Sequence, residues 1–360
     1  MKKNELFDLT ISEVLRETEN SVSIGFEVPQ ELIEKFQFLP GQHLALETEI
    51  AGEKIRRSYS LCSAPYENKW RVAVKKVSGG KFSTFANDEL KASTKIRVMP
   101  PHGNFKLSIN ANDEKNIVAF AAGSGITPII SMVKTVLQDS PNSTITLFYG
   151  NRSTDEIIFR EELENLKNKY LDRFSLYHIL SKEKTGVPLL YGRIDDEKCK
   201  IFSKHFYDVN DVDAFYLCGP APMIFTVSDE LKNLGVQDSN IHFELFNTDG
   251  IIATPKEVSE PNYDPATQSK VTLIMDGEVN EFPLAYGGNS ILEAALKEGM
   301  DLPFACKGGV CSTCKAKITA GEVDMDVNYA LEPDELERGF VLTCQSHPRT
   351  SNVTVNFDEI

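Results

Sequence analysis

The sequence has no long apolar run and carries little positive charge. No stretch approaches the roughly 18 consecutive apolar residues of a membrane-spanning helix, and residues 1–8 lack the apolar core of a secretory signal. Lys and Arg number 38 against 53 Asp and Glu, which gives a net charge of -15 at pH 7. Nucleic acids and anionic membranes would repel such a chain, so neither is an expected partner. We expect a cytoplasmic protein.

The chain is also poor in cysteine, with seven in 360 residues. Three of them stand singly, at Cys62, Cys199 and Cys218, which excludes a disulfide framework. The other four are Cys306, Cys311, Cys314 and Cys344. Their spacing, C-x4-C-x2-C followed by a distant cysteine, is the plant-type ligand pattern of a [2Fe-2S] cluster. The alternatives are a structural zinc site, which usually pairs two short knuckles, or unliganded thiols. The spacing favours the cluster and therefore a protein that moves single electrons.

Two different rhythms of apolar residues divide the rest of the chain. Short strands at 21–28, 43–48, 57–61, 70–77 and 95–99 predict an antiparallel barrel over residues 1–110. From residue 116 onward, apolar strands alternate with amphipathic helices, with strands at 117–121, 144–149, 174–180, 214–218 and 241–246. This alternation predicts a doubly wound parallel α/β domain over residues 111–246.

The last third of the chain begins with a polar stretch that contains Pro255, Pro261 and Pro265. We interpret residues 247–268 as a linker. Residues 269–360 then form a compact α+β domain around the four clustered cysteines, with strands at 271–275 and 280–283 and a helix at 290–298. The fold class is therefore multidomain.

The barrel segment carries two patterns suited to a flavin. Arg57, Tyr59 and Ser60 follow one another on a predicted strand, where an aromatic ring can stack on the flavin and a guanidinium can hold its pyrophosphate. Gly80, with the neighbouring glycine, serine and threonine, offers backbone N–H groups ahead of a short helix. Each pattern alone is weak, since Arg-x-Tyr-Ser also occurs on ordinary edge strands.

The α/β segment carries a nucleotide pattern. Gly123 and Gly125 follow the first strand and precede a helix, as in dinucleotide folds, although Pro128 departs from G-x-G-x-x-G. Cys218, Gly219 and Pro220 form a second tight turn at the carboxyl end of the fourth strand. A plain strand-to-helix turn is the alternative interpretation of either feature.

Together these motifs resemble ferredoxin-NADP reductase-type flavoproteins with a plant-type ferredoxin domain fused at the C-terminus. The likeness covers essentially the full chain, and residues 306–311 and 328–336 are most similar to reductase components of phenylacetyl-CoA epoxidases. The resemblance implies an FAD-binding barrel, an NAD(P)-binding domain and a β-grasp-like ferredoxin domain. It also implies a function in phenylacetate catabolism.

The resemblance further implies site residues. The hydride path would be formed by Ser60, Cys218 and Glu244. FAD would contact Arg57, Tyr59, Ser60, Lys75, Val77, Gly80, Phe82, Ser83, Thr127 and Phe246. NADP would contact Gly123, Gly125, Thr127, Arg152, Ser181, Lys182, Cys218, Gly219 and Pro220. From the residues alone, Glu244 is a strand-end carboxylate that suits proton relay or simply meets solvent, and Cys218 is more typical of an inert core thiol.

Coenzyme choice depends on two cationic residues. NAD-specific sites usually place a carboxylate after the second strand, where this chain has Arg152. Lys182 occupies the position at which NADPH-using relatives carry an arginine, which keeps the charge but loses the bidentate fork. We therefore expect NADPH, against the alternative that both side chains are solvated surface charges.

The sequence thus predicts a reductase that passes electrons from NADPH through FAD and a [2Fe-2S] cluster to a di-iron oxygenase. The resemblance names the phenylacetyl-CoA epoxidase as that acceptor. Acidic residues between Cys314 and Cys344, among them Asp334, Glu335 and Glu337, suggest docking on a basic partner surface. The alternatives are a reductase of another ring-hydroxylating or steroid oxygenase or of a desaturase, and a non-catalytic iron-sulfur redox sensor.

Overall fold

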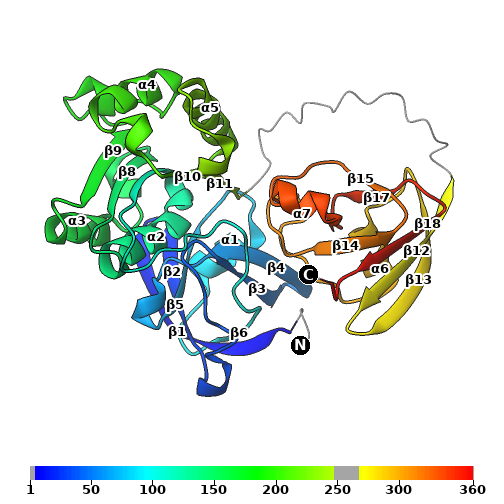
Figure 1. Cartoon of the computed structure of the whole chain (residues 1–360). Coiled ribbons are helices and arrows are strands. Elements are labelled where there is room, and N and C mark those ends of the chain that lie inside the picture. The colour runs from blue at the N-terminus through cyan, green and yellow to red at the C-terminus, as the bar shows by residue number, and fades with distance from the viewer. Residues whose placement is uncertain (1–4, 247–266, 360) are drawn as a thin grey trace. The chain divides into compact units, whose positions relative to one another are not determined.

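A computed structural model describes residues 5–246 and 267–359 (Figure 1). The predicted linker lies almost wholly outside these residues. Contacts divide the chain into two compact units, one formed by 7–101 with 105–246 and the other including 267–359. Within the described residues, no helix is both long enough and apolar enough to cross a membrane.

Six antiparallel strands form the barrel at the N-terminus. In pairing order they are β4 (Glu53–Ser60), β3 (His43–Ile50), β6 (Lys95–Val98), β1 (Phe7–Thr18), β2 (Ser21–Glu27) and β5 (Trp70–Lys75). A bridge between Leu61, which follows β4, and Val72 of β5 joins the two outer strands and closes the sheet. Helix α1 (Lys81–Asp88) packs against the barrel, with Phe82 in the barrel core.

Strand β1 is the barrel strand that the sequence does not single out. Its 12 residues bury only Leu9 and Ile11 fully, and its second half is charged and half-exposed. The alternation that marks a strand is therefore lost over most of its length.

The nucleotide domain has a parallel five-stranded sheet, as the alternating pattern predicts. In order across the sheet, its strands are β11 (Ile241–Leu245), β10 (Ala214–Gly219), β7 (Asn116–Ala122), β8 (Thr144–Asn151) and β9 (Phe174–Leu180). The helices are α2 (Ile126–Asp139), α3 (Arg160–Lys169), α4 (Asp196–His205) and α5 (Ala221–Asn233). Chain order reverses between β7 and β10, so the switch point at which doubly wound folds bind ligands lies there.

The barrel and the nucleotide domain share apolar core. Cys62, Ala73, Phe105 and Leu107 pack in the same cluster as the buried face of α2 and strands β7 and β8. These residues precede the first strand of the nucleotide sheet, yet they lie in its core. The two domains of this unit are thus joined by a core-like interface.

The C-terminal unit is a mixed sheet with two short helices. Its strands pair in the order β13 (Glu278–Ala285), β12 (Gln268–Met275), β18 (Asn352–Asn356), β14 (Lys315–Ala320) and β16 (Phe340–Leu342). Strands β15 (Val323–Met325) and β17 (Ser346–Pro348) form a separate pair, and the helices are α6 (Ile291–Lys297) and α7 (Pro333–Glu337). Helix α6 begins at its cap Ser290, whose hydroxyl accepts a hydrogen bond from the Glu293 amide.

Candidate functional site

The three residues predicted for the hydride path lie together in the structure. Ser60 ends β4 of the barrel, and its hydroxyl donates to Oε2 of Glu244 over 3.1 Å. Glu244 lies on β11 beside Cys218 of β10, its partner in the parallel register. All three side chains are buried or nearly so. One point therefore gathers side chains from the barrel and from two strands of the nucleotide sheet.

Burial shifts the pKa values around this point. It raises the pKa of Glu244 to about 8, although the hydrogen bond from Ser60 opposes the shift. The Cys218 thiol has a pKa well above its usual range, because of burial first and the nearby Glu244 second. At neutral pH Glu244 is therefore mostly protonated, and Cys218 is a thiol rather than a nucleophilic thiolate.

His43 is a member of this group that the sequence analysis missed. It lies on β3 directly across from Ser60, and its Nδ1 is 3.6 Å from Oε1 of Glu244. That separation is within ion-pair range but longer than a hydrogen bond. Burial lowers the pKa of His43 to about 4, so the imidazole is neutral at pH 7. A single histidine on a predicted strand gave no signal that it would face a carboxylate 201 residues further along the chain.

The flavin patterns of the barrel form one surface. Tyr59 packs against Phe82 of α1 with ring centroids 5.2 Å apart, and burial raises the pKa of its hydroxyl. Arg57, one position back on the same face of β4, is exposed. Its guanidinium donates to the Arg56 carbonyl over 2.7 Å and has further donors for a pyrophosphate, so an aromatic ring and a cation lie side by side.

The turn before α1 is built around Gly80. The Val77 amide donates to the Ser83 hydroxyl over 3.2 Å, and that hydroxyl donates to the Gly80 carbonyl over 3.2 Å. A Cβ on Gly80 would overlap Ser83 Oγ and come within 2.5 Å of Val77 Cγ2, so a larger residue would have to displace both side chains. No side chain caps the start of this eight-residue helix, so its first amides lack a capping partner there.

The glycine turn after β7 meets the end of β10 at the switch point. A Cβ on Gly125 would overlap the carbonyl group of Cys218, so only glycine permits this approach. Gly123 has φ +54, and its carbonyl accepts a hydrogen bond from the Tyr149 hydroxyl over 3.0 Å. The Thr127 hydroxyl donates to the Ser124 carbonyl over 3.1 Å. Helix α2 therefore starts at the crevice between β7 and β10, where pyrophosphates bind in this topology.

Other predicted contacts line the same region. Lys75 extends from β5, and its amino group lies 3.8 Å from where a Cβ on Gly123 would sit and 3.3 Å from Glu156. Val77 and Phe246 are exposed apolar side chains, 57% and 39% accessible. Each therefore keeps apolar side-chain area that a bound ligand can cover.

The two cations predicted for coenzyme choice are neighbours. The Lys182 amide donates to the Arg152 carbonyl over 2.8 Å, and the Ser181 amide donates to the Asn151 carbonyl over 2.9 Å. Both cationic side chains are exposed. The adjacent carboxylate of Glu183 accepts from the amide and hydroxyl of Thr154, and these hydrogen bonds lower its pKa. The carboxylate of Glu183, which follows Lys182, is thus hydrogen-bonded to Thr154.

In the C-terminal unit the four clustered cysteines form two close pairs. The sulfurs of Cys306 and Cys311 are 3.1 Å apart, and Cys314 and Cys344 are coupled to each other by a hydrogen bond. Among residues 5–246 and 267–359, no group of three or more His, Cys, Asp or Glu side chains surrounds one point as a single metal ion requires. Two thiol pairs are what a two-iron cluster uses, because each iron takes two sulfurs from the protein.

Donors around these sulfurs fit the same group. The Gly308 amide donates to Cys306 Sγ over 3.3 Å, and the Thr313 hydroxyl donates to Cys311 Sγ over 3.2 Å. The hydrogen bonds from Cys311 and the loop amides outweigh burial and lower the pKa of Cys306 to about 6. Hydrogen bonding within each pair thus lowers the pKa of one thiol, Cys306 or Cys344, and raises that of its partner, Cys311 or Cys314.

One predicted docking residue has a structural role instead. Glu335 is buried, and its carboxylate accepts from Lys315 over 2.6 Å and from the Glu332 amide over 3.0 Å. Asp334 is exposed but bonds Arg338 one turn away on α7. The expectation that Glu335 belongs to a free acidic surface is therefore wrong, because this side chain caps its own helix.

Three family models match the chain in sequence. The oxidoreductase FAD-binding domain matches residues 8–107, the oxidoreductase NAD-binding domain residues 120–229, and the 2Fe-2S iron-sulfur cluster binding domain residues 273–349. The order confirms the predicted arrangement of the barrel, the nucleotide sheet and the cluster domain.

Similar proteins cover the full chain. It is 43% identical over 350 residues to a subunit of the 1,2-phenylacetyl-CoA epoxidase of Escherichia coli (strain K12), with 97% of each chain covered. It is 33% identical to the ferredoxin reductase component of 3-ketosteroid-9-alpha-monooxygenase of Rhodococcus rhodochrous, covering 97% of this chain and 96% of that one. A solved phthalate dioxygenase reductase has the same fold, with a TM-score of 0.58 at 22% identity over 98% of each chain. The chain thus belongs to the family of oxygenase reductase components, electron-transfer oxidoreductases that join an FAD domain, an NAD-binding domain and a 2Fe-2S domain.

Proposed function

We propose that this chain oxidises NADPH and delivers the electrons singly to the di-iron oxygenase that epoxidises phenylacetyl-CoA. The observation that carries the proposal is the convergence of Ser60, Cys218 and Glu244 on one buried point beside the switch point. A non-catalytic iron-sulfur redox sensor, which transfers no hydride, would not need polar groups from two domains at one buried point. The higher identity to the phenylacetyl-CoA epoxidase component than to the steroid monooxygenase component supports this choice of acceptor.

The barrel surface is the proposed FAD site. Bound FAD would supply chemistry that side chains lack, since it accepts two electrons together and releases them one at a time. Tyr59 offers its ring as a stacking face, Arg57 its charge for the pyrophosphate, and the amides at the start of α1 further donors. The remaining proposed contacts are Ser60, Lys75, Val77, Gly80, Phe82, Ser83, Thr127 and Phe246.

Glu244 is the proposed proton-holding group of the site. It is mostly protonated at neutral pH, its two oxygens face Ser60 and His43, and its side chain is 10% exposed. A proton can therefore be held or exchanged at this largely buried point. Cys218, as a neutral thiol, shapes the surface beside it.

The coenzyme is proposed to lie along the carboxyl ends of β7, β8, β9 and β10. Its pyrophosphate would meet the turn at Gly123, Gly125 and Thr127, with Gly219 and Pro220 opposite. Arg152 and Lys182 lie next to each other just beyond the ends of β8 and β9, and Ser181 precedes Lys182 after β9. Two adjacent cations favour a 2'-phosphate over a bare ribose hydroxyl, and this supports NADPH.

Cys306, Cys311, Cys314 and Cys344 are the proposed cluster ligands. The pairing of their sulfurs and the donors from Gly308 and Thr313 support that assignment. A bound cluster would take up single electrons and pass them on.

The testing experiment uses the purified full chain. Absorption spectra with FAD, iron and zinc analyses come first, followed by anaerobic mixing with NADPH or NADH and then by addition of the oxygenase with phenylacetyl-CoA. We expect FAD and two irons per chain, a kcat/KM at least about tenfold higher with NADPH, and epoxide formation. A protein with both groups bound that oxidises neither coenzyme would be a sensor. Zinc without iron would refute the cluster, and coupling only to other oxygenases would refute the acceptor.

A further inference from the structure

Lys134 is a buried cation in the middle of α2, with a side chain 3% exposed. Its amino group donates to the carbonyl of Cys62 over 3.1 Å and lies 3.4 Å from Oε2 of Glu67, both in the barrel. It also forms an ion pair with Glu162 of α3. One ammonium therefore connects two helices of the nucleotide domain to the barrel turn that follows Ser60.

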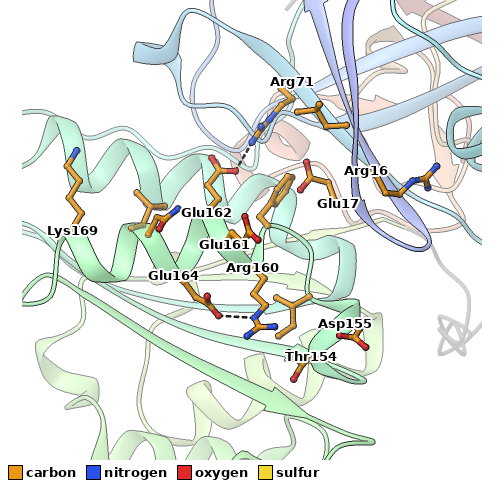
Figure 2. Close-up of a pocket in the computed structure, with 15 residues that line it drawn as sticks. Arg16, Glu17, Arg71, Thr154, Asp155, Arg160, Glu161, Glu162, Glu164 and Lys169 are labelled. Carbon is orange, nitrogen blue, oxygen red and sulfur yellow. Dashed lines mark hydrogen bonds and ion pairs between the residues drawn. The ribbon is translucent and has the colours of Figure 1, made fainter.

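A second ion pair completes this group. Arg71 of β5 donates to Oε2 of Glu162 over 2.7 Å, as Figure 2 shows. Burial raises the pKa of Glu162, but Lys134 and Arg71 outweigh it, so the pKa falls below its usual value. Glu162 is thus an anion between two cations, one from each side of the domain interface. We refer to Lys134, Glu162, Arg71 and Glu67 as the interdomain clasp.

A neutral hydrogen bond extends the clasp by one turn of helix. The Ser131 hydroxyl of α2 donates to the Ser63 carbonyl over 2.6 Å. Consecutive barrel carbonyls, those of Cys62 and Ser63, thus accept from side chains three positions apart on one face of α2. Two directional bonds at adjacent carbonyls fix rotation as well as distance.

The groups on either side of the clasp explain why it affects the orientation of the barrel relative to the nucleotide domain. Cys62 is fully buried in the apolar cluster that includes Ile129, Ile130 and Val133 of α2, and apolar contacts are non-directional. On the other side of the Arg71–Glu162 pair lies a cavity of about 980 Å³ between β1, β5 and α3, so close packing does not set the angle there (Figure 2). The directional interactions of the clasp therefore act together with the shared apolar core in setting the angle between the two domains.

Both ends of the clasp lead to the functional site. The carbonyl that Lys134 holds is two residues beyond Ser60, and α2 begins at the glycine turn of the switch point. We propose that Lys134 is a positioning residue that sets the separation between the flavin surface of the barrel and the coenzyme crevice. The inference rests on the proposed function, in which one hydride, two electrons with a proton, passes from NADPH to FAD. That transfer falls steeply with small misplacements of the reacting groups.

The test compares Lys134→Met with wild type, with Lys169→Met as the matched control. Lys169 is exposed, lines the same cavity and takes no part in the clasp. We expect Lys134→Met to lower the rate constant of FAD reduction by NADPH at least about tenfold, with the Kd for NADPH and the FAD content within about twofold of wild type. Lys134→Arg should restore much of the rate, and Lys169→Met should leave it unchanged.

A readout independent of turnover is alkylation of Cys62, followed by mass spectrometry. Its thiol is fully buried under the clasp, so its alkylation should be at least about tenfold faster in Lys134→Met and unchanged in Lys169→Met. If Lys134→Met does not fold, Ser131→Ala removes one directional bond alone and should show both effects in smaller degree. Slower reduction together with faster alkylation supports the proposal, and either effect without the other overturns it. If the wild-type protein itself is not reduced by NADPH or NADH, the proposed function fails instead.

Discussion

Replacing Glu244 with glutamine should remove a pH dependence of stability that the buried carboxyl creates. The folded-state pKa of Glu244 is about 8 against 4.5 for the ordinary side chain. Between those values the folded chain keeps a proton that the unfolded chain has lost. The free energy of unfolding therefore falls as pH rises, by about 1.4 kcal/mol per pH unit.

His43 contributes a slope of the opposite sign. Its pKa is about 4 in the folded chain and 6.5 ordinarily, so between these values the unfolded chain holds the extra proton. The free energy of unfolding then rises with pH. The two contributions cancel between pH 4.5 and 6.5, and above pH 6.5 only that of Glu244 remains. From pH 6.5 to 8 the wild-type chain should lose about 2 kcal/mol that Glu244→Gln keeps.

The assay is urea unfolding at pH 5, 6.5 and 8, followed by the fluorescence of Trp70. This is the single tryptophan, and it lies in β5 of the barrel with its indole N–H donating to the Phe36 carbonyl over 2.6 Å. Other titrating groups are shared by both chains and cancel in the difference. Ser60→Ala should raise the pKa of Glu244 further, because the hydrogen bond that it removes favours the ionised carboxyl. The free energy of unfolding should then continue to fall to a higher pH than in wild type. If the difference between wild type and Glu244→Gln is the same at pH 6.5 and 8, Glu244 is ionised in the folded chain and the reasoning is refuted.

Three further outcomes are expected. Cys344→Ser should lose the cluster but keep FAD and NADPH-ferricyanide turnover, measured by iron and flavin content; loss of FAD as well would contradict the modular arrangement. Lys182→Ala with Arg152→Ala should lower kcat/KM for NADPH about tenfold or more and leave NADH little changed, since each charge-assisted contact is worth roughly 1.5–3 kcal/mol. Oxygenase-coupled rates should fall several-fold from low to high salt, and charge reversal at Asp334 and Glu337 should weaken that dependence; rates that stay flat would exclude electrostatic docking.

Local patterns predicted most of the elements. A continuous apolar run marked β7, because an inner strand of a parallel sheet is buried on both faces. Glycine turns and cysteine spacing were equally readable, since each reflects a local steric or ligand requirement. Gly125 illustrates this, because its closeness to Cys218 leaves no room for a side chain.

The charged groups of the interior could not be predicted in the same way. Lys134 lies in an apolar helix, where a lone lysine normally marks the solvent-facing side. It is buried because the barrel covers that side, with partners 72 residues before it and 28 residues after it in the chain. His43 is similar, since its neighbour Glu244 comes from the last strand of the nucleotide sheet. Sequence periodicity reports one face of one element and carries no information about such partners.

Glu162 and Glu244 show how the groups around a buried carboxyl decide whether it is ionised. Glu162 has two cations against it, which outweigh burial and keep it ionised. Glu244 has a hydroxyl and a neutral imidazole, which do not outweigh burial, so it holds a proton near neutral pH. An ionised Glu162 maintains the domain orientation across the pH range in which Glu244 titrates. A carboxyl group therefore stays ionised and pairs with two cations at Glu162, whereas at Glu244 it exchanges a proton. Because Glu162 does not change its charge in this pH range, proton exchange at Glu244 leaves the geometry that the clasp maintains undisturbed.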